Sequence, residues 1–270
     1  MIYYVVDAFA DHVFEGNPAG VCILEEWLPI ELMEKIAIEN NLSETAFAVK
    51  EGHRYGLRWF TPGGEIDLCG HATMATAYII FEFIDKNLDD IVFYTKKAGH
   101  QLTVSKTADL LVLDFPVIIP IEYETKSYMI EALGAIPRKT YRTEQYLIFE
   151  FDTEEKVRQL TPDFKLLKEF PIGLSVFITA RSNDDDYDFV ARAFWPKMSI
   201  DEDPVTGAMY CCLVPYWKER FRKDQMIARQ VSKRGGTVYC ECCGDRVKIG
   251  GKSVLYLKGN IYPNIEGVQV

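Results

Sequence analysis

Short apolar stretches broken by turn residues run along most of the chain. Stretches rich in Val, Ile, Tyr and Phe are typical of strands, and the clearest lie at residues 2–9, 55–60, 146–151 and 187–195. Two longer apolar runs have helical length: one runs from Thr73 to Phe83 and is opened by Gly70, and the other runs from about Gly207 to Trp217. Many short strands with two long apolar helices favour an α+β fold, in which a curled sheet surrounds each helix.

The residues before the two apolar helices resemble each other. FTPGGEIDLCGHATMA starts at Phe60 and FWPKMSIDEDPVTGAMYCC starts at Phe194. Both contain Phe-x-Pro, an Asp, a Gly and then small and apolar residues. This echo predicts two copies of one unit, each offering a helix N-terminus to a shared cleft. The similarity alone is loose enough that a coincidence of two loop–helix junctions stays open.

The first of these junctions has the chemistry of an anion-accepting corner. The first N–H groups of a helix lack internal partners and carry the positive end of the helix dipole. A Gly at that place lets a ligand come close to the backbone. Gly70 and His71 therefore could accept an anion, although His71 could equally be a capping or core histidine.

The length, charge and cysteine content of the chain limit which partners and which cellular location are expected. The chain has 270 residues, enough for one large or two small domains, and its net charge is −10. That balance argues against nucleic acid or an anionic membrane as a partner, because both favour basic surfaces. No stretch approaches the length of a membrane span, and the N-terminus lacks the features of a signal peptide. Seven cysteines without a secretory context predict reduced thiols and a cytoplasmic location.

The extended stretch Pro116–Pro120 is the candidate crossing between two domains, 1–115 and 116–270. A meander of strands is expected to close the chain, at residues 231–232, 237–242, 246–249 and 254–257. The last strand returning to the first domain is an alternative to this division.

Six blocks of residues carry a resemblance to a known family. The chain resembles the PhzF-like family of phenazine-biosynthesis isomerases, within the diaminopimelate-epimerase-like fold. The blocks stand in the family's order and reach from the first strand to near the C-terminus. They are DAFADHVFEGNPAGV from Asp7, NLSETAF from Asn41, RWFTPGGEIDLCGHAT from Arg58, IDEDPVTGA from Ile200, PYW from Pro215 and RQVSKRGG from Arg229.

The resemblance implies a fold and a mode of action. It implies two pseudo-symmetric domains, each a curled and mostly antiparallel sheet around a central helix, with a cleft between them. It also implies a small-molecule substrate that carries a carboxylate, no metal or organic cofactor, and a homodimer.

The family's catalytic glutamate falls on Glu44. From the residues alone, Glu44 lies where the chain turns apolar, between Leu42 and Phe47, and a carboxylate so placed can exchange a proton near neutrality. Without the resemblance, a surface glutamate or a cap partner of Ser43 is the favoured interpretation. With the resemblance, catalysis is favoured.

The same resemblance places further residues at the site. It implies that Gly70, His71 and Asp203 line the substrate site, with His71 bonding the substrate or relaying a proton. Asp203 would hold a substrate group and tune His71, and a helix-capping role just before Pro204 is compatible with this. Asn17 is a further binding candidate, although Asn before Pro is common in plain turns.

The chain departs from the family at the second helix start. The family pattern has Thr-Gly-Ser-Ala-His, whereas this chain has Thr206-Gly207-Ala208 followed by Met and Tyr. Ala208 lacks the hydroxyl that would contact a substrate carboxylate, although its backbone N–H, like that of Gly207, is present. The departure bears on the identity of the substrate more than on the chemistry.

A thiol mechanism is the rival hypothesis. Epimerases of this fold use two thiols, one at each helix start. Cys69 occupies the first position, where the helix N-terminus would lower its pKa, but no thiol stands near Thr206. The cysteines at 240, 242 and 243 lack the spacing of a common zinc site and are interpreted as packing or surface residues.

These observations lead to one hypothesis and two alternatives. The hypothesis is a cofactor-independent isomerase in which Glu44, with His71 and Asp203, moves a proton on a small carboxylate-bearing substrate. The alternatives are a non-catalytic small-molecule-binding protein on the same fold, which Ala208 motivates, and a thiol-based racemase or epimerase that uses Cys69.

Overall fold

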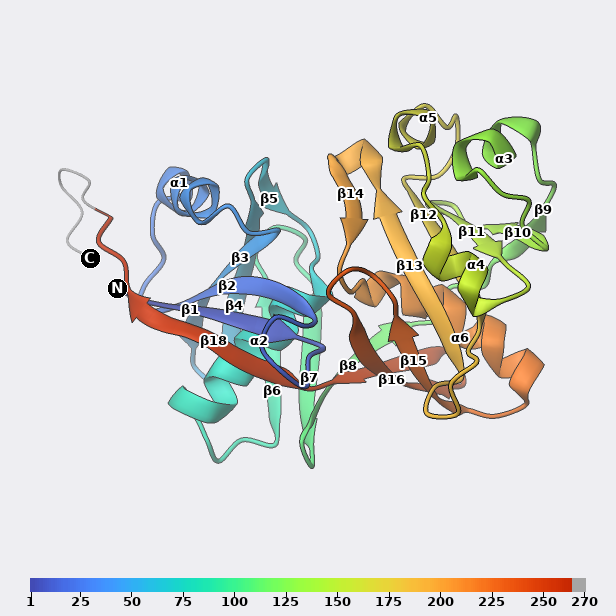
Figure 1. Ribbon diagram of the computed structural model, residues 1–270. Helices are drawn as coiled ribbons and strands as arrows, with labels where there is room; N and C mark the ends of the chain where they lie inside the picture. Colours follow the sequence, from blue (N-terminus) through green and yellow to red (C-terminus); the bar gives the residue numbers. More distant parts are fainter. Residues whose placement is uncertain (264–270) are drawn as a thin grey trace. The chain divides into compact units, whose positions relative to one another are not determined.

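The computed structural model describes residues 1–263. It divides into two units (Figure 1): unit 1 contains Met1–Asp114 and the C-terminal segment from Gly250, and unit 2 contains Phe115–Ile249. The last strand therefore belongs with the start of the chain rather than with the residues that precede it. It pairs antiparallel with the first strand, from Ile2 opposite Asn260 to Ala8 opposite Ser253.

Unit 1 is a sheet around one short, small-residue helix. Its strands follow the pairing order β18, β1, β2, β3, β4, β6, β7, with β2/β3 and β4/β6 parallel and the other neighbours antiparallel, while β5 pairs with β4. Helix α2 contacts β1, β2, β3, β7 and β18. The elements are β1 (Ile2–Ala8), β2 (Asn17–Leu24), α1 (Ile30–Asn40), β3 (Glu44–Glu51), β4 (Arg54–Thr61), β5 (Gly64–Ile66), α2 (Gly70–Ile79), η1 (Ile80–Ile84), β6 (Asp90–Thr95), β7 (Gln101–Thr107), β8 (Leu110–Pro116) and β18 (Ser253–Asn260).

Unit 2 repeats this scheme of pairings. Its strands follow the order β9, β10, β11, β12, β13, β15, β16, with β11/β12 and β13/β15 parallel and the other neighbours antiparallel, while β14 pairs with β13. The elements are β9 (Ile121–Tyr123), α3 (Ser127–Leu133), β10 (Lys139–Arg142), β11 (Tyr146–Glu150), α4 (Glu154–Gln159), α5 (Phe164–Lys168), β12 (Ser175–Arg181), β13 (Phe189–Trp195), η2 (Pro196–Met198), β14 (Ile200–Asp203), α6 (Gly207–Phe221), β15 (Gln225–Gln230), β16 (Gly236–Cys243) and β17 (Arg246–Gly251).

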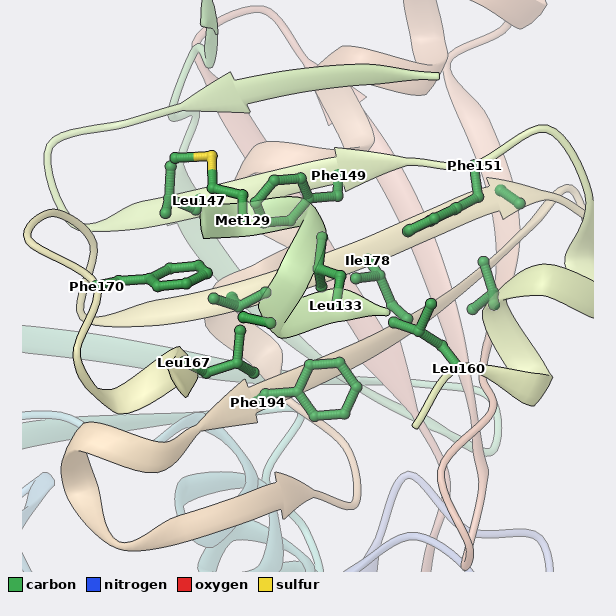
Figure 2. Packing of buried hydrophobic residues seen from close by; sticks show 14 of the residues in the cluster. Met129, Leu133, Leu147, Phe149, Phe151, Leu160, Leu167, Phe170, Ile178 and Phe194 are labelled. Carbon is green, nitrogen blue, oxygen red and sulfur yellow. The ribbon is translucent and has the colours of Figure 1, made fainter. Parts of the chain in front are cut away.

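The sheet of unit 2 has apolar residues on both faces. On one face, Leu147 and Phe149 of β11 pack with Phe194 of β13 against the short helices α3 to α5 (Figure 2). On the other face, Phe189 stacks on Trp217 of α6 with ring centroids 5.7 Å apart. Because successive side chains of a strand point to opposite faces, a sheet buried on both sides has continuous apolar strands, as 146–151 shows.

The two apolar helices differ in extent from the sequence expectation. The apolar run expected over 73–83 forms α2 from Gly70 to Ile79 and then a π-helical turn, η1. The helix expected over 207–217 continues to Phe221 and ends at Arg222, whose φ of 55° is left-handed. The closing strand expected at 231–232 lies at Gln225–Gln230 instead. Among the described residues, no helix combines the length and apolar character needed to cross a bilayer.

Candidate active site

Glu44 is the first residue of β3, and its position follows from the turn that ends α1. Asn41 terminates that helix in the left-handed conformation, with φ of 49°, which Asn tolerates better than most residues. The chain then enters β3 beside β2, with Glu44 opposite Ala19. The side chain that results is buried, with only 8% of Glu44 exposed.

Glu44 faces His71, the second residue of α2. The Oε2 atom of Glu44 lies 3.0 Å from Nε2 of His71, and His71 is 6% exposed. The pair is close enough for ionic attraction, but the two atoms fall short of good hydrogen-bond alignment. A carboxylate and an imidazole in contact, both away from water, are two groups that can exchange a proton.

Two further side chains contact the other ring nitrogen of His71. Nδ1 lies 3.3 Å from Nδ2 of Asn17 and 3.5 Å from Sγ of Cys69. An amide nitrogen donates only, so with Asn17 in this orientation Nδ1 of a neutral His71 accepts and the ring proton is on Nε2, toward Glu44. Asn17 therefore helps to fix the tautomer that faces the carboxylate. A charged imidazole carries a proton on Nδ1 as well and would face the amide oxygen of Asn17 instead.

The electrostatics of the cluster favour a charged imidazole. Burial by itself would lower the pKa of His71, but its contacts with the acidic groups of Cys69 and Glu44 more than offset this and raise the pKa well above its ordinary value. Burial also raises the pKa of the Cys69 thiol, and the Glu44 charge adds to this. Because Cys69 is then a thiol near neutrality, the Glu44 carboxylate is the partner that stabilises the imidazolium.

This result corrects the sequence expectation for Cys69. The N-terminus of a helix was expected to lower the pKa of its thiol, and Cys69 is indeed the N-cap residue of α2. Its side chain is however buried and near a carboxylate, and both effects act against the thiolate. The direction of the pKa shift is therefore opposite to the expectation.

Glu44, Cys69 and His71 are also the residue types that bind transition metals. One ligand atom from each lies within 4.8 Å of the others. However, His71 turns Nε2 to Glu44 and Nδ1 to Cys69, and a metal ion binds one ring nitrogen only. The arrangement is thus a chain of polar contacts through the imidazole, not three donors aimed at one point.

Asp203, Gly207 and Ala208 form a second group, which belongs to unit 2. Asp203 ends β14, and its carboxylate accepts a hydrogen bond from the hydroxyl of Thr206, the N-cap residue of α6. Gln230 donates to the Asp203 carbonyl at 2.8 Å and accepts from the Thr206 N–H at 2.9 Å. Gly207 and Ala208 are the first two residues of α6. The N-cap residue of α6 is thus Thr206 rather than Asp203, and Asp203 contacts the side chain of that residue.

The structure therefore places Asn17, Glu44, Gly70 and His71 together in unit 1. Sequence reasoning did not anticipate that Cys69 touches His71; the signal was the Cys-x-His spacing at the helix start. The other cysteines take part in packing, as expected: Cys240 and Cys242 are buried on β16, and Cys243 is partly exposed.

Comparison with known proteins decides the family. The model of the PhzC-PhzF family, described as phenazine biosynthesis-like protein, matches residues 6–259. The chain belongs to this family. An uncharacterized isomerase of Pseudomonas aeruginosa is 43% identical over 259 residues, which cover 96% of this chain and 97% of that protein. The crystal structure of a PhzF-family phenazine biosynthesis protein from Enterococcus faecalis is 47% identical, with a TM-score of 0.93, and covers 97% of this chain and 98% of that chain.

More distant structures share the fold of this PhzF-family protein. A probable proline racemase from Agrobacterium radiobacter is 10% identical, with a TM-score of 0.62 over 97% of this chain and 92% of that chain. The expected mixed α and β fold, shared by PhzF proteins and these racemases, is thus confirmed. Family membership and the names of its relatives make the chain an isomerase of the PhzF family.

Proposed function

We propose that the chain is a cofactor-independent isomerase in which Glu44 removes a proton from carbon and returns it. The substrate would be a small molecule whose acidic C–H lies beside a carboxylate or an enol. The observation that carries the proposal is the buried contact of 3.0 Å between Glu44 and His71 at the start of α2. Exposed glutamates are common, whereas a buried carboxylate against an imidazole is rare and costly unless it has a task.

The proposed reaction is a proton transfer in two steps. The Glu44 carboxylate takes the proton from carbon, and the electron pair of the C–H bond is delocalised into the adjacent carboxylate or enol of the substrate. Glu44 then delivers the proton to the same or another carbon on the same face. A positioned acid–base group of this kind contributes on the order of 10²–10⁴-fold in rate.

His71 and the start of α2 would support this transfer. The imidazole lies 3.0 Å from the Glu44 carboxylate through Nε2, and its raised pKa favours a positive charge beside the base. The N–H groups of the first turn of α2 would stabilise negative charge that develops on the substrate. They accelerate the reaction only if they bind the transition state better than the substrate.

The thiol mechanism has less support. The pKa of Cys69 is raised, so the thiolate that would attack a C–H bond is disfavoured at neutral pH. A mechanism with two thiols also needs a second cysteine at the start of α6, where Thr206 stands. Cys69 is better explained as a packed neighbour of His71.

Several roles remain predictions. Substrate contacts of Asn17, Gly70, Asp203, Gly207 and Ala208, the homodimer and the absence of a cofactor all come from the resemblance to the family. The non-catalytic binding protein remains the alternative that Ala208 motivates. Proton exchange with any ligand would exclude that alternative.

Solvent-deuterium exchange tests the proposal. Unsaturated cyclic and amino carboxylic acids are incubated in D₂O with the wild type, Glu44→Gln, Cys69→Ala and the control Glu39→Gln, which changes an exposed glutamate of α1. We expect deuterium incorporation in the wild type, in Cys69→Ala and in Glu39→Gln, and its loss in Glu44→Gln. Exchange that survives in Glu44→Gln but disappears in Cys69→Ala would replace the proposal with thiol chemistry.

A further inference from the structure

Unit 2 contains a polar cavity whose lining includes none of the candidate site residues. Its volume is about 410 Å³, within the range of small-molecule sites. Four basic residues line it, Arg138, Lys139, Arg181 and Arg220, against two acidic ones. This excess of positive charge stands out in a chain whose net charge is −10.

The two acidic residues of the cavity already have partners. Glu150 is 5% exposed, accepts a hydrogen bond of 2.6 Å from the Tyr216 hydroxyl and lies 3.8 Å from Nη1 of Arg138. Asp152 pairs with Lys156 at 2.9 Å. Of the guanidinium groups in the lining, Arg138 therefore has a carboxylate beside it, that of Glu150. Neither carboxylate pairs with Arg181 or Arg220.

Arg181 and Arg220 pair with no carboxylate within residues 1–263. Arg181 lies over the Phe221 ring, with its guanidinium carbon 5.5 Å from the centroid. Arg220 lies 3.5 Å over the Tyr216 ring and donates to the Tyr216 carbonyl and the Tyr141 hydroxyl, both at 3.0 Å. Aromatic rings and neutral oxygens thus orient both guanidinium groups without neutralising their charge.

A rigid aromatic wall supports these arginines. Trp217 stacks between Phe189 and Phe221, with centroid distances of 5.7 and 4.9 Å and ring planes within 19° and 9° of parallel. The Trp217 indole N–H donates to Thr179 at 3.0 Å, which fixes the ring. An apolar wall lowers the local dielectric, so an anion in the cavity would interact more strongly with the guanidinium groups than in open water.

From this arrangement we infer that the cavity is a binding site for a small phosphate-bearing anion. Three guanidinium groups offer more donors than one carboxylate can accept, whereas a phosphate or pyrophosphate group has the charge and the oxygens to meet several of them. Free phosphate compounds and phosphate esters share this chemistry. The inference does not depend on the proposed function, because the cavity lies in unit 2 and the Glu44–His71 pair in unit 1.

Isothermal titration calorimetry with pyrophosphate tests the inference. The wild type is compared with Arg181→Gln and Arg220→Gln, and with the control Arg142→Gln, which removes an exposed arginine of unit 2 outside the cavity lining. We expect Arg181→Gln and Arg220→Gln to bind pyrophosphate at least about tenfold more weakly, and the control to match the wild type. Circular dichroism and melting curves of every variant confirm that it is folded.

A change of opposite sign makes the test sharper. Glu150→Gln removes a buried negative charge from the lining and keeps an oxygen for the Tyr216 hydroxyl. We expect this variant to bind pyrophosphate more tightly than the wild type, a gain that loss of structure would not produce. Glu144→Gln, an exposed acid outside the cavity lining, should leave binding unchanged.

Further ligands separate the sources of the anion and the class of charge. Inorganic phosphate and a phosphate monoester such as glycerol phosphate are titrated beside pyrophosphate, and tighter binding of the ester would identify esters as the source. Citrate carries comparable charge on carboxylates and should bind more weakly. No binding of pyrophosphate to the wild type, equal losses in Arg142→Gln, or citrate binding as tightly as pyrophosphate would overturn the inference.

Discussion

The chain has the same local structure before α2 and before α6, but the side chains at the two helix starts differ in their chemistry. In each, the last two residues of a strand are Phe-x and a Pro follows; a short antiparallel strand comes next, and a helix begins at a glycine. The pairing aligns them further: Phe60 lies opposite Thr45 in unit 1, and Phe194 lies opposite Val176 in unit 2. Glu44, just before Thr45, therefore corresponds to Ser175 in unit 2.

The same alignment extends to the other members of the site. Counted from the first glycine of each helix, Cys69 corresponds to Thr206, and His71 corresponds to Ala208. Unit 2 thus has a small side chain at every position where unit 1 has an ionisable one. The repeated fold supplies a helix start in both units, and the buried Glu44–His71 contact has no counterpart at the equivalent positions of unit 2, Ser175 and Ala208.

The polar groups at the start of α6 form hydrogen bonds with one another and with the backbone. Thr206 donates to Asp203, and Gln230 bridges the backbone of both residues. These hydrogen bonds satisfy groups that a buried helix start would otherwise leave unpaired. At the start of α2, by contrast, the contacts converge on an imidazole that can change its charge.

The largest effect is expected when the missing carboxylate is added to unit 2. Ser175 is 1% exposed, so Ser175→Glu would bury a carboxylate there. The residue of unit 2 that corresponds to His71 is Ala208, which offers no imidazole to pair with that carboxylate. We expect the free energy of unfolding to fall by about 3 kcal/mol or more, because an unpaired buried charge is not compensated. Urea denaturation measures the change, and Ser175→Gln serves as the uncharged control of nearly equal size. If Ser175→Glu were as stable as the wild type, a buried carboxylate would be tolerated at position 175 without a partner such as His71, which would contradict this prediction.

The His71 imidazolium predicts a pH-dependent effect. Its pKa is raised in the folded protein, so its contribution to stability is fully present below the unfolded value of about 6.5 and is lost as the pH rises through the folded value. The stability difference between the wild type and His71→Gln should therefore be largest in mild acid and shrink toward alkaline pH. Urea titrations at several pH values measure it, with His53→Gln, an exposed histidine, as the control. A difference that grows with pH would contradict the Glu44–His71 ion pair.

A smaller effect is expected at the start of α6. Thr206→Val keeps the shape of the side chain and removes the hydroxyl that donates to Asp203. We expect a loss of about 1.5–3 kcal/mol in the free energy of unfolding, as for a hydrogen bond to a charged group. Thermal melts at neutral pH measure it, while proton exchange per folded molecule should change little. A loss of exchange without a loss of stability would give Thr206 a role in the chemistry.

The smallest effect is expected at Cys69. Cys69→Ala removes one sulfur atom from a buried site, so we expect about 1 kcal/mol of destabilisation and exchange within about threefold of the wild type. Cys69→Ser, which keeps a donor toward Nδ1 of His71, should be closer still to the wild type in exchange. Exchange reduced by two orders of magnitude in both variants would make the thiol part of the mechanism.

The features that the sequence predicts best are those set by neighbouring residues in the chain. The starts of both apolar helices, at Gly70 and Gly207, follow from turn residues followed by an apolar run. The pKa of Cys69 could not be predicted in the same way, because it depends on burial by strands far away in the sequence and on the charge of Glu44. The correspondence of Glu44 with Ser175 likewise required the strand pairing, since no sequence motif joins these two positions.

The basic cavity of unit 2 could not be predicted from the sequence for a similar reason. Arg138, Arg181 and Arg220 lie in three separate segments, and each alone is an ordinary surface arginine. Only the packing of α6 against the sheet brings them to one lining. Scattered charges of this kind carry no spacing that a motif could describe.

The most direct test of the central claim compares the two equivalent positions in one assay. Deuterium incorporation from D₂O into a substrate found with the wild type is measured for Glu44→Gln and for Ser175→Ala. We expect a loss of at least about 100-fold in Glu44→Gln and an unchanged rate in Ser175→Ala. Exchange that persists in Glu44→Gln, or that disappears equally in Ser175→Ala, would contradict the assignment of the acid–base chemistry to unit 1.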